Sequence, residues 1–324
     1  MPRIWCPFAL GLVWVAFSAC AIAQPAYPSK SIRFICPFSA GGAADLVTRH
    51  IAGQLAQRLG REVVVENRTG ANGNIGTLAV AQAEPDGHTL LLGFDGTLVI
   101  NPHLYPKLPF DPLADFAPVG KIGDVSLLVI ANPQLPARTL AELIAHSKAR
   151  PNGLAYGTAG IGSTQHIMFE LLRQRSGANF VHAPYKGAAP ALVDVIGGHL
   201  PLVGAALAGS LDHIKSGKLR ALAISTAQRS KFVPDVPTLA ESGYADLVIT
   251  GWHGILVPAK TPRAIVERLN TELNAALAEP AVVERLDVIG SVAAPGSAER
   301  FAENIKRDLE RYGQVVRAAG IKVE

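Results

Sequence analysis

The chain has few of the residues that hold small exported folds together through covalent bonds or metals. It has three cysteines in 324 residues, and two of them, Cys6 and Cys20, fall in an N-terminal segment that we expect to be removed. The third, Cys36, cannot form an intramolecular disulfide by itself, so the fold must depend on its hydrophobic core. We expect Cys36 to be a buried, unreactive strand residue. The nine histidines show no zinc-site spacing, and we predict no metal.

The chain also has no large excess of one charge and no long apolar run. The 30 Lys and Arg residues nearly balance the 26 Asp and Glu residues, and the net charge of +4 comes without a basic run. A nucleic acid is therefore not an expected partner. No segment reaches the roughly 18 uninterrupted apolar residues of a membrane-spanning helix, so we expect a mature protein that stays in solution.

The first residues have the pattern of an export signal. Arg3 supplies a positive charge, residues 8–19 form a short apolar core, and a small-residue cleavage site ends at Ala23. We predict a cleaved signal peptide over residues 1–23. A second possibility is cleavage before Cys20, because residues 17–20 loosely resemble a lipoprotein signal in which that cysteine carries a lipid.

Short apolar runs that predict strands alternate with segments of helical spacing almost throughout the chain. A strand over 32–36, for example, precedes Val47, Ile51 and Leu55 at four-residue spacing. This alternation predicts an α/β protein with mainly parallel sheets covered by helices. A proline-rich stretch over 101–118 predicts an irregular connector.

A chain of this length tends to divide into two units. A strand predicted near residues 125–131 would carry the chain into a second lobe, and one near 250–257 would return it. We therefore predict one lobe from residues 24–125 and 249–324 and a second lobe from residues 126–248.

Two glycine-rich turns of similar design stand out, over residues 37–45 and 156–164. Each follows a predicted strand and precedes a predicted helix, where unpaired backbone N–H groups and the helix dipole favour an anion. The alternative is an ordinary strand-to-helix turn that uses glycine for its backbone freedom. The candidate ligand contacts in these turns are Ser39, Ala40, Gly41, Gly42 and Asp45 in the first and Thr158, Ala159, Gly162, Ser163 and Thr164 in the second.

Two further turns supply one candidate each. Thr97 follows a predicted strand at the sheet edge where open α/β sheets bind ligands. Lys186 precedes another predicted helix and would bring a cation to the same edge. The alternatives are a plain turn at Thr97 and a solvated lysine at position 186.

Cofactor and enzyme motifs are absent or incomplete. Gly160 and Gly162 suggest a dinucleotide fingerprint, but Gln165 stands where the third glycine is required, and we predict no cofactor. Ser163 and His166 are three residues apart, but a hydrolytic triad would need a histidine from elsewhere and an orienting acid. An exported hydrolase therefore remains a remote alternative.

Eight motifs together resemble the Bug-type solute-binding receptors of tripartite tricarboxylate transporters. They occur in the order of that family from about Tyr27 to the C-terminus. The motifs span residues 35–42, 64–68, 70–76, 85–90, 115–119, 156–163, 184–187 and 234–239.

The resemblance implies a periplasmic, two-lobed "Venus flytrap" with a hinge, without catalytic activity. It implies that a carboxylate lies between the lobes, met by backbone amides of residues 39–42 and 158–164. It also implies delivery of that ligand to a two-subunit membrane permease, and we expect the receptor to be a monomer. A sensor that presents its ligand to a membrane signalling protein is the alternative use of the same fold.

One departure from the family pattern bears on the ligand. Many relatives carry a Phe-Asp pair at the positions of Gly204 and Ala205, where this chain is small and apolar. We therefore take Ala205 as a ligand contact and expect a ligand with an apolar or aromatic body and one or two carboxylates.

Overall fold

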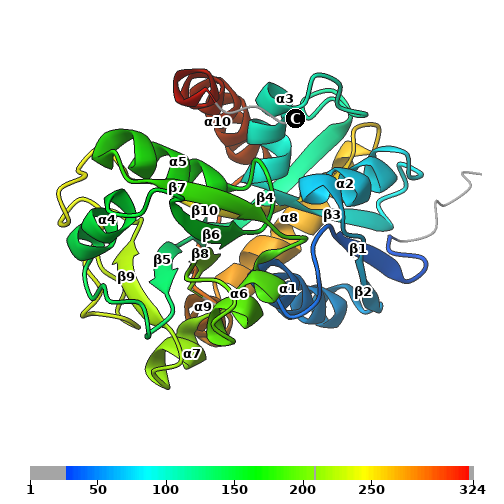
Figure 1. The fold of residues 1–324 in the computed structure, drawn as a ribbon. Helices are drawn as coiled ribbons and strands as arrows, with labels where there is room; N and C mark the ends of the chain where they lie inside the picture. The colour runs from blue at the N-terminus through cyan, green and yellow to red at the C-terminus, as the bar shows by residue number, and fades with distance from the viewer. Residues whose placement is uncertain (1–26, 208, 321–324) are drawn as a thin grey trace, which may run out of the picture.

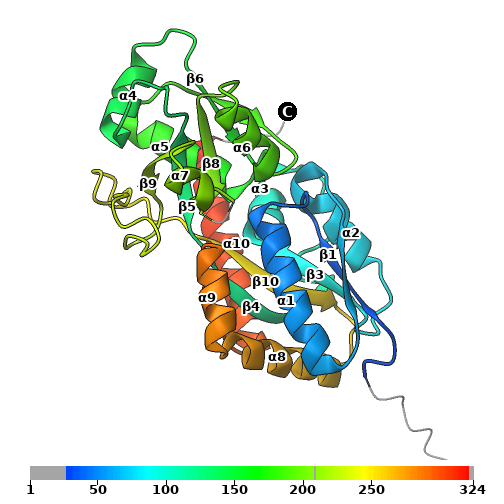
Figure 2. The same cartoon turned by 90° about the horizontal axis from the view of Figure 1, so that it is seen from below.

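The computed structural model describes residues 27–207 and 209–320. The predicted signal peptide and Cys20 lie outside these residues. Figures 1 and 2 show two α/β lobes, one blue, cyan and orange and the other green and yellow, each built on its own sheet.

The first lobe contains a six-stranded sheet in the order β11-β4-β10-β3-β1-β2. Its strands are β1 (Ile32–Cys36), β2 (Val63–Asn67), β3 (Thr89–Phe94), β4 (Phe116–Val125), β10 (Gly251–Pro258) and β11 (Ser291–Ala293). Its helices are α1 (Ala43–Leu59), α2 (Asn74–Ala81), α3 (Asn101–Leu104), α8 (Arg263–Leu277), α9 (Pro280–Val288) and α10 (Ala298–Ala319). A 3₁₀ turn, η1 (Ala71–Gly73), and a π-helical turn, η2 (Gly96–Ile100), complete it.

The second lobe contains a five-stranded sheet in the order β7-β6-β8-β5-β9. Its strands are β5 (Leu127–Ala131), β6 (Leu154–Thr158), β7 (Phe180–Pro184), β8 (Leu202–Ala206) and β9 (Arg220–Ile224). Its helices are α4 (Leu140–Lys148), α5 (Thr164–Ser176), α6 (Ala188–Ile196) and α7 (Leu211–Lys215).

The two-lobed α/β fold is confirmed, but both sheets are mixed rather than mainly parallel. In the first lobe β1 runs parallel to β2 and β3, whereas β10 is antiparallel to β3 and β4. In the second lobe β5 is antiparallel to both of its neighbours. The reason is that β5 and β10 enter their sheets from the inter-lobe end, where β8, β3 and β4 finish. A strand that enters at that end must run against the strands that end there.

The chain crosses between the sheets twice. The first crossing is the single residue Ser126 between β4 and β5, and the second lies between β9 and β10. Ser225 ties the crossings together, because its buried hydroxyl donates to the Ile249 carbonyl at 2.5 Å and accepts from the Leu127 amide at 3.3 Å. The prediction of an irregular connector over 101–118 was wrong at both ends of that stretch, where α3 and the start of β4 form.

Apolar spacing explains how the helices attach to the sheets. On α8 the buried residues Val266, Leu269, Leu273 and Leu277 follow a three- and four-residue repeat and pack into the first lobe's core with α1. Cys36 is fully buried in the same core, which raises the pKa of its thiol to about 11. Within the described residues, every helix is too short or too polar to cross a bilayer.

Candidate functional site

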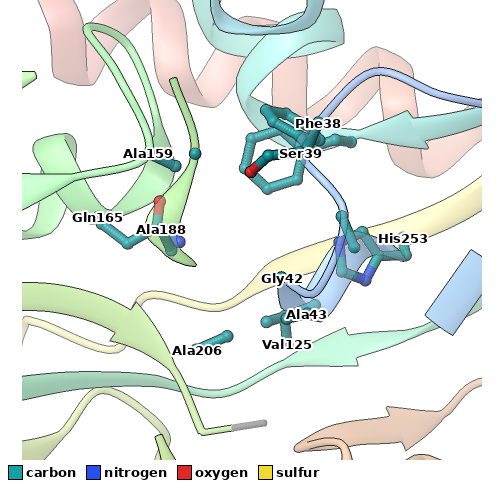
Figure 3. A pocket seen from close by; sticks show the side chains of 13 residues that line it. Phe38, Ser39, Gly42, Ala43, Val125, Ala159, Gln165, Ala188, Ala206 and His253 are labelled. Carbon is teal, nitrogen blue, oxygen red and sulfur yellow. The ribbon is translucent and has the colours of Figure 1, made fainter. Parts of the chain in front are cut away.

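A cavity lies where the two lobes meet, and both contribute to its wall (Figure 3). In the picture the Ser39 hydroxyl and the Gln165 amide point into the space from opposite sides, and His253 lies on the same side as Ser39. The lining residues are Phe38, Ser39, Gly42, Ala43, Ala44, Phe94, Val125, Ala159, Gln165, Gly187, Ala188, Ala206 and His253.

The N-terminus of α1 opens onto this cavity without a side-chain cap. Gly42 is the N-cap residue and accepts the first helical hydrogen bond from the Leu46 amide at 3.0 Å. The amides of residues 43–45 precede that bond and have no intrahelical acceptor. Two residues of this turn, Ala43 and Ala44, line the cavity, so N–H donors and the positive end of the helix dipole lie at its wall.

Asp45 holds the loop before α1 instead of facing the cavity. Its Oδ2 accepts from the Gly41 amide and from Arg49 Nε, each at 3.0 Å, and its Oδ1 accepts from Asn67 at 2.9 Å. Although burial opposes ionisation, these hydrogen bonds keep the pKa of Asp45 below its ordinary value. The carboxylate therefore serves to position the Ser39–Gly42 backbone.

A second uncapped helix start, that of α6, meets the cavity from the other lobe. Its N-cap residue, Gly187, provides no side-chain cap, and both Gly187 and Ala188 line the cavity. The φ of Gly187 is +134°, and a Cβ there would lie 2.5 Å from Ser39 Oγ. A glycine is thus required for the two lobes to approach at this point.

The second glycine-rich turn, at the start of α5, contacts the first lobe more than the cavity. The Ser163 hydroxyl accepts from the His166 amide at 3.3 Å and caps α5, while Thr164 donates to Asp95 Oδ2 at 2.5 Å. The Gly162 amide donates to His166 Nδ1 at 3.2 Å. Only Ala159 of the five residues predicted in this turn lines the cavity.

The other predicted site residues lie outside the cavity wall, and two of them make hydrogen bonds within the protein through their side chains. Thr97 donates to the Asn72 carbonyl at 2.7 Å, and the Thr158 hydroxyl donates to the Gly160 carbonyl at 3.1 Å. Ala40 and Lys186 are exposed. Lys186 lines a second pocket, to which both lobes contribute. Gly41 and Ala205 line a groove beside the cavity.

Sequence analysis missed two polar side chains in the wall, Gln165 and His253. They are 5% and 2% exposed, and Gln165 Oε1 and His253 Nδ1 have no hydrogen-bond partner among the described residues. Burial lowers the pKa of His253 to about 4, so this ring is neutral at pH 7. A signal was present, because a lone histidine interrupts an otherwise apolar strand over 251–258.

The remaining wall is apolar and uncharged. Phe38 and Phe94 meet edge to face with ring centres 5.1 Å apart, and Val125 and Ala206 complete this side. None of the lining residues is Asp, Glu, Lys or Arg. Backbone dipoles and neutral polar groups beside aromatic rings suit a small anion with an apolar body.

The geometry offers no hydrolytic machinery at Ser163. Its hydroxyl is used by a backbone amide, and the ring of His166 accepts from Gly162 and stacks on His182 at 3.9 Å between ring centres. Burial lowers the pKa of His166 to about 4, and no carboxylate is hydrogen-bonded to its ring within the described residues. A base with an orienting acid is therefore not assembled here.

Comparison with known proteins shows the family of this chain. The model of the tripartite tricarboxylate transporter family receptor matches residues 47–321. Protein BugT of Bordetella pertussis is 38% identical over 320 residues, which cover 97% of this chain and 98% of that protein.

Two solved structures share the fold over nearly all of their length. The periplasmic binding protein BugD is 34% identical with a TM-score of 0.88, covering 92% of this chain and 100% of its own. Rpa4515 of R. palustris, solved with adipate, is 33% identical with a TM-score of 0.89 and the same coverage. The chain therefore belongs to the tripartite tricarboxylate transporter family receptors, and it is a solute-binding receptor rather than an enzyme.

Proposed function

We propose that this receptor, exported to the periplasm after cleavage behind Ala23, captures a small carboxylate between its lobes and delivers it to a two-subunit membrane permease. The observation that carries the proposal is the meeting of two uncapped helix starts, α1 and α6, at one uncharged cavity. The adipate bound to Rpa4515 supports the same ligand class.

The chemistry is recognition by neutral donors. A carboxylate loses hydration when it enters the cavity, and charge-assisted N–H···O bonds at two helix ends offset that loss. Micromolar affinity corresponds to about −8 kcal/mol, which a few such bonds and buried apolar area supply together. Phe38 and Phe94 would contact the apolar or aromatic body of the ligand.

Calorimetric titration of the mature protein tests the proposal. The panel contains adipate, benzoate, hexanoate, citrate and an amino acid at pH 7. Saturable binding confined to acids with an apolar body is the expected result. Binding of citrate or the amino acid far more tightly than the apolar acids would contradict the apolar ligand class, and binding of no carboxylate would contradict the receptor assignment of this cavity.

A further inference from the structure

An apolar groove continues from the cavity along α6. It runs between the start of α1, one face of α6 and the segment after β8, and Figure 1 shows α6 beside the start of α1. Its wall is made mostly of small and aliphatic residues. Those lining only the groove include Ala189, Leu192, Val193, Ile196, Ala205 and Gly209.

The cavity and the groove meet at four residues that line both. These are Gly42, Ala43, Ala188 and Ala206. None of the four has a side-chain atom beyond Cβ, so only backbone and methyl groups stand between the two spaces. The rings of Phe38 and Phe94 line the cavity but not the groove.

The groove also holds an exposed apolar surface that needs an explanation. Val193 is 65% exposed, the largest value among the exposed large hydrophobic residues of the described chain. Leu192 and Ile196 on the same helix extend this apolar lining, and His213 is the one ionisable side chain in the groove wall. Water contact with such a surface is unfavourable, and an apolar ligand segment laid along it would remove that contact.

We propose that the physiological ligand is an unbranched aliphatic carboxylate whose hydrocarbon chain passes between Gly42 and Ala188 into this groove. Its carboxylate stays at the N-termini of α1 and α6, so the proposal rests on the function proposed above. A flexible chain can follow this junction of small residues, whereas a rigid aromatic ring would remain in the cavity against Phe38 and Phe94.

The chain length of the ligand tests this directly. Each CH₂ group moved from water into an apolar groove should improve the dissociation constant about fourfold. Calorimetry with butanoate, hexanoate and octanoate, each below its micellar concentration, should therefore show a gain of about two orders of magnitude across the series. Benzoate is the comparison ligand, because the proposal keeps its ring in the cavity.

A matched pair of variants locates the effect. Ala189→Phe places a ring in the groove at the second residue of α6, and it should reduce the octanoate-to-butanoate affinity ratio to near one. Ala141→Phe is the control, because Ala141 is the exposed second residue of α4 in the same lobe and lines neither space. Gly209→Leu is a second blocking variant, since this glycine has an ordinary φ and a Cβ there would lie 3.4 Å from Leu192.

The two proposals fail in different ways. Equal affinity for butanoate and octanoate, or tight benzoate binding with a series that weakens with length, would overturn the groove and leave the receptor function standing. A length-dependent gain that persists in both blocking variants would also overturn it. Binding of no carboxylate, adipate included, would overturn both proposals.

Discussion

Gln165 combines a functional position with a structural cost. It is buried in the cavity wall, and its Oε1 has no partner among the described residues. The unpartnered Oε1 is an acceptor that a carboxylate cannot satisfy, so it destabilises the protein, whereas the Nε2 amino group of the same side chain can donate to a bound carboxylate. Such a residue should favour binding at the expense of the stability of the ligand-free protein.

Gln165→Met should separate these effects. We expect the affinity for the carboxylate to fall about tenfold, while the free energy of unfolding without ligand rises by about 1 kcal/mol. Calorimetric titration measures the first and urea unfolding the second. A variant that binds normally but unfolds more easily would show that Gln165 is structural only.

Asp95 is a buried carboxyl group whose ionisation the folded structure disfavours. It is completely buried between the lobes, where it accepts from Thr164 and lies near the buried Asp308. Burial, aided by the charge of Asp308, raises its pKa to about 7 despite hydrogen bonds from Thr164 and the Trp252 amide. The buried phenol of Tyr312 lies close to the same group.

The raised pKa gives a signed pH dependence. Below about pH 4 Asp95 is protonated in both the folded and unfolded states, and its contribution to stability is fully present. Between about pH 4 and 7 the unfolded chain ionises first, so stability is lost by up to about 1.4 kcal/mol per pH unit. Asp95→Asn should remove this loss, and the difference in unfolding free energy between variant and wild type should grow from pH 4 to pH 7. A pH-independent difference would contradict the raised pKa.

At the scale of elements, the start of α1 is the clearest functional feature. The Gly42 N-cap has φ −78° and ψ 169°, an extended conformation that a following proline tolerates. Ala43 is the first helical residue, where proline is accepted because its N–H has no intrahelical role. A proline there removes one candidate donor without disturbing the helix.

Ala43→Pro should therefore weaken carboxylate binding about tenfold with little change in melting temperature, because one charge-assisted hydrogen bond is lost. Ala298→Pro is the matched control, since it is the first residue of α10 and follows an extended N-cap, Ser297. It should change neither quantity. Equal affinities for the two variants would show that the amide of Ala43 does not meet the ligand.

At the scale of the whole molecule, the lobes are joined by side-chain contacts as well as by the two crossing segments. Thr164 reaches Asp95, and Lys231 pairs with Asp287 at 2.6 Å. Gly162 is packed closely, because a Cβ there would lie 2.7 Å from Asn101 Oδ1 and 2.6 Å from Leu104 Cδ1. The second glycine-rich turn thus allows the lobes to come together.

Gly162→Ala should impede this approach. Its φ of +79° adds backbone strain to the clash, so we expect at least tenfold weaker binding and a smaller ligand-induced decrease in the radius of gyration measured by small-angle X-ray scattering. Gly217→Ala is the control, because Gly217 has a similar φ of +73° and a new Cβ there would have nothing within 4 Å. This variant should keep the wild-type affinity and the ligand-induced decrease in the radius of gyration. Equal effects of the two substitutions would assign the loss to backbone strain alone.

Local sequence determined the secondary structure and one of the site loops of this protein. The alternation of strands and helices, the helical repeats of α1 and α8, and the glycine-rich loop before α1 follow from periodicity and turn chemistry within some twenty residues. The two-lobed α/β fold and the family were predicted from motif order. The assignment of Ser39 and Gly42 to the ligand remains a prediction, although both line the cavity.

Only the tertiary structure decided which helix starts face the ligand cavity. The turns before α1 and α5 are similar as sequences, yet α5 is capped by Ser163 and packs on the first lobe, whereas α1 is uncapped and lines the cavity together with the start of α6. Strand direction at the crossings and the burial of Gln165 and His253 were also decided there. The physical reason is that these features depend on contacts between residues far apart in the chain, and local backbone preferences do not encode such contacts.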